Sequence, residues 1–139
     1  MKQKFFDFNI NTNGQKLYEF TDQIIDLIKK NDFKNGILNL HIQHTSASLI
    51  VQENADPDVQ TDLINYFDKI APMDNSLYTH TIEGKDDMPA HIKSSLTNNQ
   101  ITLSIKNGEL ILGTWQGLYL FEHRLAPQSR KIVFHFLGE

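Results

Sequence analysis

The sequence contains no cysteine, which excludes disulfides, thiolate metal sites and a cysteine nucleophile. It has no basic run longer than a pair, and its net charge is −4 with histidines neutral, so we expect no nucleic-acid partner. It also lacks the roughly 20 consecutive apolar residues of a membrane-spanning helix. The apolar part of the N-terminus is too short and too broken for a signal peptide. These absences predict a cytoplasmic protein that does not bind a membrane.

The 139 residues that are present fit one domain, residues 1–139. Alternating apolar residues predict a strand over residues 6–10. Apolar residues at helical spacing from Leu17 to Ile28 predict an amphipathic helix, and Asn35-Gly36 ends it. The chain therefore begins with a strand followed by a helix.

The middle of the chain alternates in the same way. Residues 37–44 predict a strand with two distinct faces, and residues 47–53 predict its continuation or its hairpin partner. Asp56-Pro57 is typical of a helix start, with Asp as the N-cap and Pro at the first helical position. Ala71-Pro72 ends that helix, and an aperiodic polar loop follows over residues 73–88.

The last third of the chain is rich in strands. Residues 89–96 predict a short helix, and Asn107-Gly108 between two apolar segments predicts a hairpin. Residues 117–123 and 130–139 predict two further strands. Six or seven strands and two or three helices, with consecutive strands late in the chain, predict an α+β fold with mostly antiparallel pairing.

Three polar segments carry the residues that could do chemistry. The first, "HIQHTSASLIVQENADP", ends just before a helix N-terminus, which suits an anion, although ordinary helix capping explains the same residues. The second, "YTHTIEGKDDMPAH", offers imidazoles and carboxylates for a metal ion, but it matches no zinc signature and could be a solvated acidic loop. The third, "GTWQGLYLFEHR", offers a tryptophan for stacking or packing and an arginine for an ion pair or a phosphate.

The segments "QHTSASLIVQENADP", "YTHTIEGKDDMPAHIKSSL" and "GTWQGLYLFEHR", with the ending "FLGE", resemble the YjbQ family, also called the secondary thiamine-phosphate synthase family. The resemblance runs from about Phe6 to Glu139. It implies an α+β domain built on a β-sandwich, association as a homotrimer, and a divalent metal, Mg²⁺ or Zn²⁺, or a small anion near the histidines.

The resemblance also implies a weak or secondary thiamine-phosphate synthase activity, which joins a pyrimidine diphosphate to a thiazole phosphate and releases diphosphate. Such a transferase needs charge neutralisation and positioning of a phosphorylated small-molecule substrate. The catalytic residues are then expected to be His44, His80, His91 and Glu122. The substrate-binding residues are expected to be Thr45, Ser46, Asn54, Lys93, Trp115 and Arg124. The metal ligands are expected to be His44, His80, Asp87 and His91.

Two other functions fit the same residues. One is a non-catalytic trimer that binds a metal or a phosphorylated metabolite, with the histidines holding a structural ion. The other is a metal-dependent phosphohydrolase. All three functions require that His44, His80 and His91, from separate segments, surround a common cavity.

Overall fold

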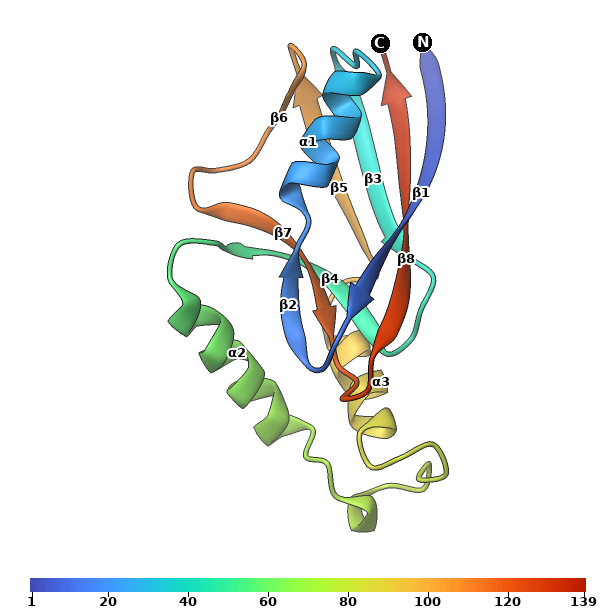
Figure 1. Cartoon of the computed structure of the whole chain (residues 1–139), viewed down its shortest axis with the longest axis vertical. Coiled ribbons are helices and arrows are strands. Elements are labelled where there is room, and N and C mark those ends of the chain that lie inside the picture. The colour runs from blue at the N-terminus through green and yellow to red at the C-terminus, as the bar shows by residue number, and fades with distance from the viewer.

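Eight strands and three α-helices make up the computed structural model, which describes residues 1–139 (Figure 1). A short 3₁₀ helix, Asn75–Leu77, lies in the loop between the second and third helices. The helices are α1 (Thr21–Lys30), α2 (Pro57–Ile70) and α3 (Asp87–Leu96). The strands are β1 (Lys2–Thr12), β2 (Lys16–Glu19), β3 (Gly36–Ile42), β4 (Ala47–Glu53), β5 (Gln100–Lys106), β6 (Glu109–Leu110), β7 (Gln116–Glu122) and β8 (Gln128–Gly138).

The strands form two antiparallel sheets. The larger sheet has the order β1-β8-β3-β5-β6, and the smaller has the order β2-β7-β4. β1 and β8 pair over their full lengths, from Lys2 opposite Gly138 to Thr12 opposite Gln128. This arrangement confirms the predicted α+β class and its antiparallel pairing in a single domain.

The core lies between the two sheets and is closed along one side by α1. Leu38, Leu40 and Phe134 from the larger sheet are fully buried, as are Leu49 and Leu120 from the smaller one. α1 adds two buried side chains to the same core, Ile24 and Ile28, and Phe20 just before the helix adds a third. Phe33, just after α1, stacks on Phe136 with ring centroids 3.8 Å apart.

The local sequence signals placed most elements correctly. Asn107 and Gly108 have φ angles of 54° and 81°, as the predicted two-residue hairpin turn between β5 and β6 requires. The predicted helix over Leu17–Ile28 begins too early, because Leu17 belongs to β2 and pairs with Phe121 of β7. α3 also begins earlier than predicted, at Asp87 rather than Pro89.

Both chain termini lie at one end of the sheets, and α3 lies at the other end, next to β4 and β7 (Figure 1). α2 runs along the outside of the smaller sheet and contributes no fully buried residue. None of the three helices combines the length and the apolar character needed to span a membrane.

Candidate metal centre

The N-terminal turn of α3 places two candidate ligands on one face. Asp87 is the first residue of the helix, and His91 follows four residues later, so both side chains project from the same side. Pro89 fits in this first turn because an N–H there has no partner within the helix. The loop before α3 brings His80 and Glu83 to the same side.

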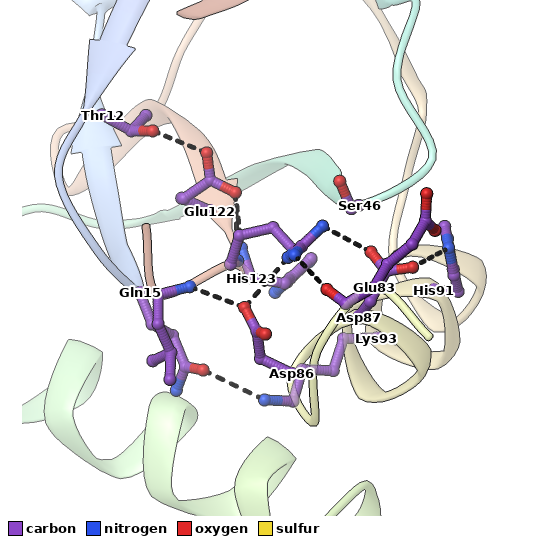
Figure 2. Close-up of polar contacts among 12 residues, drawn as sticks. Thr12, Gln15, Ser46, Glu83, Asp86, Asp87, His91, Lys93, Glu122 and His123 are labelled. Atoms are coloured by element: carbon purple, nitrogen blue, oxygen red, sulfur yellow. Dashed lines mark hydrogen bonds and ion pairs between the residues drawn. The ribbon is translucent and has the colours of Figure 1, made fainter. Parts of the chain in front are cut away.

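His80, Glu83, Asp87 and His91 form one group, and Figure 2 shows three of them, Glu83, Asp87 and His91, close together. His80 Nε2 lies 2.7 Å from Asp87 Oδ2, and His91 Nε2 lies 3.0 Å from the same oxygen. Glu83 Oε2 lies 3.2 Å from His80 Nε2. One nitrogen or oxygen from each of the four residues falls within 4.8 Å of every other.

His91 shows why this convergence suits a cation. Its Nδ1 lies 2.9 Å from the backbone oxygen of Thr45, an atom that can only accept a hydrogen bond. Nδ1 therefore carries a hydrogen, and in the neutral ring Nε2 then presents a lone pair to the carboxylate of Asp87. Two acceptors facing each other need either a proton or a metal ion between them. A backbone carbonyl behind a metal-binding histidine is the usual way to fix that tautomer.

The spacing of the donor atoms suits a small divalent ion. Bonds of about 2.0–2.2 Å to a tetrahedral ion place neighbouring ligand atoms about 3.3 Å apart. Three of the separations are 2.7 to 3.2 Å and the others lie within 4.8 Å, so small side-chain shifts would admit the ion. Two imidazoles and two carboxylates are a donor set found around Zn²⁺ and other transition-metal ions.

Asp87 is held from behind by an arginine. Its side chain is 3% exposed, and its second oxygen, Oδ1, accepts a hydrogen bond of 2.6 Å from Arg124. Burial alone would raise the pKa of Asp87, but the hydrogen bond to His80 and the positive charge of Arg124 outweigh burial and lower it. The hydrogen bond to Asp87 in turn raises the pKa of His80. The aspartate is therefore ionised and ready to act as a ligand.

The structure brings together three of the four predicted metal ligands. His80, Asp87 and His91 are in the group, whereas His44 lies outside it. His44 follows β3, and its Nε2 accepts a hydrogen bond of 3.0 Å from the backbone N–H of Lys131 on β8. Glu83 takes the fourth place instead. The spacing of Asp87 and His91 could have identified their shared face, had the helix been predicted to begin at Asp87.

Glu122 and Ser46, predicted to meet the substrate, lie in a buried ion-pair network. Arg130 donates to both oxygens of Glu122, at 2.7 and 2.6 Å, and Thr12 donates to one of them at 2.6 Å (Figure 2). Arg130 also donates to Ser46 Oγ at 3.0 Å. Glu122 is completely buried, so it does not face a ligand in this chain.

The other predicted substrate-binding residues are scattered. Lys93 is 1% exposed, and its ammonium group contacts Asp68 of α2 at 2.6 Å. Trp115 is 63% exposed, and its backbone oxygen accepts from the backbone N–H of Asn54, away from α3. Thr45 is exposed beside His91 and contributes its backbone oxygen. The four cavities of the molecule are lined by other residues than the four of the metal group.

Comparison with known proteins gives one consistent result. The sequence profile described as "UPF0047 protein YjbQ-like" matches residues 6–139. A UPF0047 protein of Synechocystis is 48% identical over 130 residues, which cover 94% of this chain and 88% of that protein. The UPF0047 protein YjbQ of Escherichia coli O157:H7 is 44% identical over 139 residues and covers 99% of this chain and 98% of its own length.

Solved structures agree with the fold. A crystal structure of a YjbQ/UPF0047 protein from Clostridium acetobutylicum superposes with a TM-score of 0.86 at 32% identity, covering 95% of this chain and 99% of its own. A crystal structure from Sulfolobus solfataricus has a TM-score of 0.86 at 23% identity, covering 99% of this chain and 100% of its own. The second structure is described as a YjbQ-like protein of unknown function, and its likeness bears on the fold alone.

These comparisons overturn the predicted activity. The relatives carry only the family designation, and nothing in their descriptions indicates a thiamine-phosphate synthase or any other transferase. The structure also gives a physical reason against the predicted synthase activity. Lys93, Ser46 and Arg124, the donors expected to bind the two phosphorylated substrates, each have partners within the chain.

Proposed function

Because the chain belongs to the YjbQ-like UPF0047 family, which has no established activity to transfer, we propose a function from the site itself: the protein binds a divalent metal ion through His80, Glu83, Asp87 and His91. The observation that carries this proposal is the meeting of two imidazole Nε2 atoms at one buried carboxylate oxygen. Each contact between an imidazole nitrogen and the Asp87 oxygen requires a positive species between the two atoms, and a bound cation takes the place of a proton there.

The ligands differ in how firmly they are held, which supports a site that exchanges its outer ligands. Asp87 is fixed by Arg124, and His91 is fixed by the Thr45 carbonyl. The Glu83 side chain is 61% exposed, and its Oε2 lies 3.2 Å from His80 Nε2. Two ligands held from behind and one exposed carboxylate resemble an open metal site more than a closed structural one.

A phosphorylated small molecule is the ligand we propose for the open position. Asp86, Asp87 and Glu83 outnumber Arg124, so the site without metal is negatively charged and repels phosphate. A bound divalent ion offsets that charge and supplies a direct contact to a phosphate oxygen. Phosphate binding should therefore depend strictly on the metal.

A trimer of these chains, each with its two sheets packed as a β-sandwich, completes the proposal. The open position of the metal group lacks an enclosing cavity within one chain. Exposed apolar side chains lie in the loop before α3 and after Arg124, namely Leu77, Ile82 and Leu125, with exposed fractions of 59%, 91% and 48%. A neighbouring subunit would cover such side chains. Light scattering should then give a mass three times the 16.0 kDa of one chain.

The metal-binding proposal is tested by calorimetric titration of chelator-treated protein with Zn²⁺, Mn²⁺ and Mg²⁺. We expect one ion per chain, and we expect His91→Ala to weaken binding at least 100-fold because it removes an anchored nitrogen ligand. His41→Ala is the matched control, since His41 lies on β3 outside the metal group. Equal affinities for wild type and His91→Ala would show that the ion binds elsewhere.

The phosphate proposal has its own experiment. Inorganic phosphate is titrated into the protein with the metal and into the chelator-treated protein. We expect binding only in the first case. Binding of equal strength without metal would point to another site and would leave the metal proposal intact.

A further inference from the structure

We infer that Arg124 determines which metal ion the site prefers: by occupying one oxygen of Asp87 it limits this carboxylate to a single bond, which favours Zn²⁺ over Mg²⁺ and Ca²⁺. This inference rests on the proposed metal site. It goes beyond that site because it identifies the ion and assigns Arg124, which the sequence suggested as a substrate-binding residue, to a different role. Arg124 is a positioning residue, since it acts through Asp87.

Each of the three nitrogens of the Arg124 guanidinium donates a hydrogen bond within the chain. Its Nε donates to Asp86 Oδ2 at 2.9 Å, its Nη1 to Asp87 Oδ1 at 2.6 Å, and its Nη2 to the backbone oxygen of Glu83 at 2.9 Å. The side chain is only 20% exposed. A planar group bonded on three sides holds its partners in one geometry, which an ammonium on a flexible stem does not.

Two potential oxygen ligands are withheld by these bonds. Asp87 Oδ1 points to the arginine, so Asp87 offers the imidazoles only Oδ2. Asp86 Oδ2 accepts from Arg124 and also from the backbone N–H of Leu125 at 3.0 Å. The chain therefore presents two nitrogens, one fixed oxygen and the mobile Glu83. Without Arg124, Asp87 could bind through both oxygens and Asp86 could turn toward the ion.

The ions differ in what they require. Ca²⁺ takes six to eight oxygen ligands, often from bidentate carboxylates, and Mg²⁺ takes octahedral oxygen ligands and keeps several waters. Zn²⁺ binds four ligands tetrahedrally and accepts imidazole nitrogen readily. A site with two nitrogens and a single-oxygen aspartate meets the requirement of Zn²⁺.

The turn before α3 is built to bring Glu83 within reach of Arg124. Gly84 has a φ of +106°, a conformation that side-chain-bearing residues rarely adopt. A Cβ atom at this position would lie 2.9 Å from Asp86 Oδ1. The glycine thus lets the Glu83 carbonyl and the Asp86 carboxylate face the same guanidinium.

The test compares wild type with Arg124→Met and Arg124→Lys, measuring the dissociation constants of Zn²⁺ and Ca²⁺ for each. We expect Arg124→Met to weaken Zn²⁺ binding 10- to 100-fold, the usual effect of losing a group that orients a ligand. We expect its Ca²⁺ binding to stay equal or tighten, so that the ratio of the two affinities falls at least tenfold. Arg124→Lys should lower the same ratio, because one ammonium group cannot bond to the carboxylates of both Asp86 and Asp87.

The ratio of the Zn²⁺ and Ca²⁺ affinities separates this role from a merely structural one, because partial unfolding would weaken the binding of both ions together. Arg130→Lys, which alters another buried arginine–carboxylate pair, is the control and should leave the ratio unchanged. If wild type binds Zn²⁺ and both Arg124 variants keep its ratio, the inference fails and the metal site stands. If wild type binds neither ion, the proposed function fails with it.

Discussion

His123 is a buried histidine whose protonation the fold opposes. The residue is fully inaccessible; its Nε2 lies 2.9 Å from Ser48 Oγ, and its Nδ1 has no partner. Burial, together with the positive charges of Lys93 and Arg130, lowers the pKa of His123 to about 3. The unfolded chain restores a pKa near 6.5.

This difference predicts a pH dependence of stability. Between about pH 3 and pH 6.5 the unfolded chain binds a proton at His123 that the folded chain does not. The contribution of His123 to stability is therefore fully present above pH 6.5 and falls by about 1.4 kcal/mol per pH unit below it. Urea denaturation of wild type and His123→Gln from pH 7 to pH 4.5 measures the effect. In the variant, the slope of the unfolding free energy against pH should be smaller by the amount that one proton contributes, about 1.4 kcal/mol per pH unit. An unchanged slope would mean that His123 does not take up a proton on unfolding.

Single residues were also where the sequence was least informative. Lys93, Arg124 and Glu122 were expected to meet a ligand, because charged side chains in polar segments are typical of binding sites. Each instead has an opposite charge within the fold: Asp68, Asp87 and Arg130 respectively. A buried ion pair and a binding site require the same residue types, so only the three-dimensional arrangement separates them.

At the scale of elements, one ion pair joins α2 to α3, and Phe67 of α2 also packs edge-on against Phe121 of the smaller sheet, with ring centroids 5.5 Å apart. The helix begins as predicted, with Asp56 Oδ1 accepting the backbone N–H of Asp58 at 2.9 Å. None of its residues is fully buried, but its Asp68 reaches the buried ammonium of Lys93 on α3. Gln15 completes the contact by bonding both side chains. α2 and the helix that carries Asp87 and His91 are thus linked.

The two ends of this ion pair should respond differently to mutation. Asp68→Ala leaves the ammonium of Lys93 buried with only Gln15 as a partner, and we expect a loss of about 2–3 kcal/mol. Lys93→Met replaces the charge with an apolar chain, and Asp68 is 42% exposed and can be hydrated, so we expect a loss below about 1 kcal/mol. Chemical denaturation at pH 7 compares them. Equal losses would contradict the assignment of the cost to the buried ammonium.

Strand and helix signals in the sequence succeeded where local chemistry decides the structure. The Asn107-Gly108 turn and the Asp56-Pro57 start depend on backbone conformation and capping, which neighbouring residues determine. The start of α1 was misplaced because Leu17 has helical spacing by coincidence. Its pairing with Phe121, more than a hundred residues later, overrides local preference.

At the scale of the whole molecule, the fold brings distant segments to one end. The metal group comes from the loop before α3 and from α3 itself, and it is oriented by the turn after β3 and the end of β7. The sequence predicted that His44, His80 and His91 converge, and in the structure His80 and His91 meet at Asp87 whereas His44 lies outside the group. His44 and His91 are each bound to the backbone of another segment, and only His91 has a ring nitrogen that faces Asp87.

Metal binding should raise the melting temperature of the whole chain. An ion present at 100 times its dissociation constant adds about 2.7 kcal/mol, which corresponds to roughly 10 °C for a chain of this size. Differential scanning calorimetry with Zn²⁺ should show this rise, and a chelator should reverse it. Asp87→Asn should lose most of the rise. A rise of the same size in that variant would mean that the stabilising ion binds elsewhere.

The central claim is that one ion lies between His80, Asp87 and His91, and anomalous diffraction from Zn²⁺-soaked crystals at the zinc absorption edge tests it most directly. We expect one strong peak per chain, about 2.0–2.2 Å from His80 Nε2, His91 Nε2 and Asp87 Oδ2. No peak at that position, with the two rings still hydrogen-bonded to the aspartate, would contradict the claim.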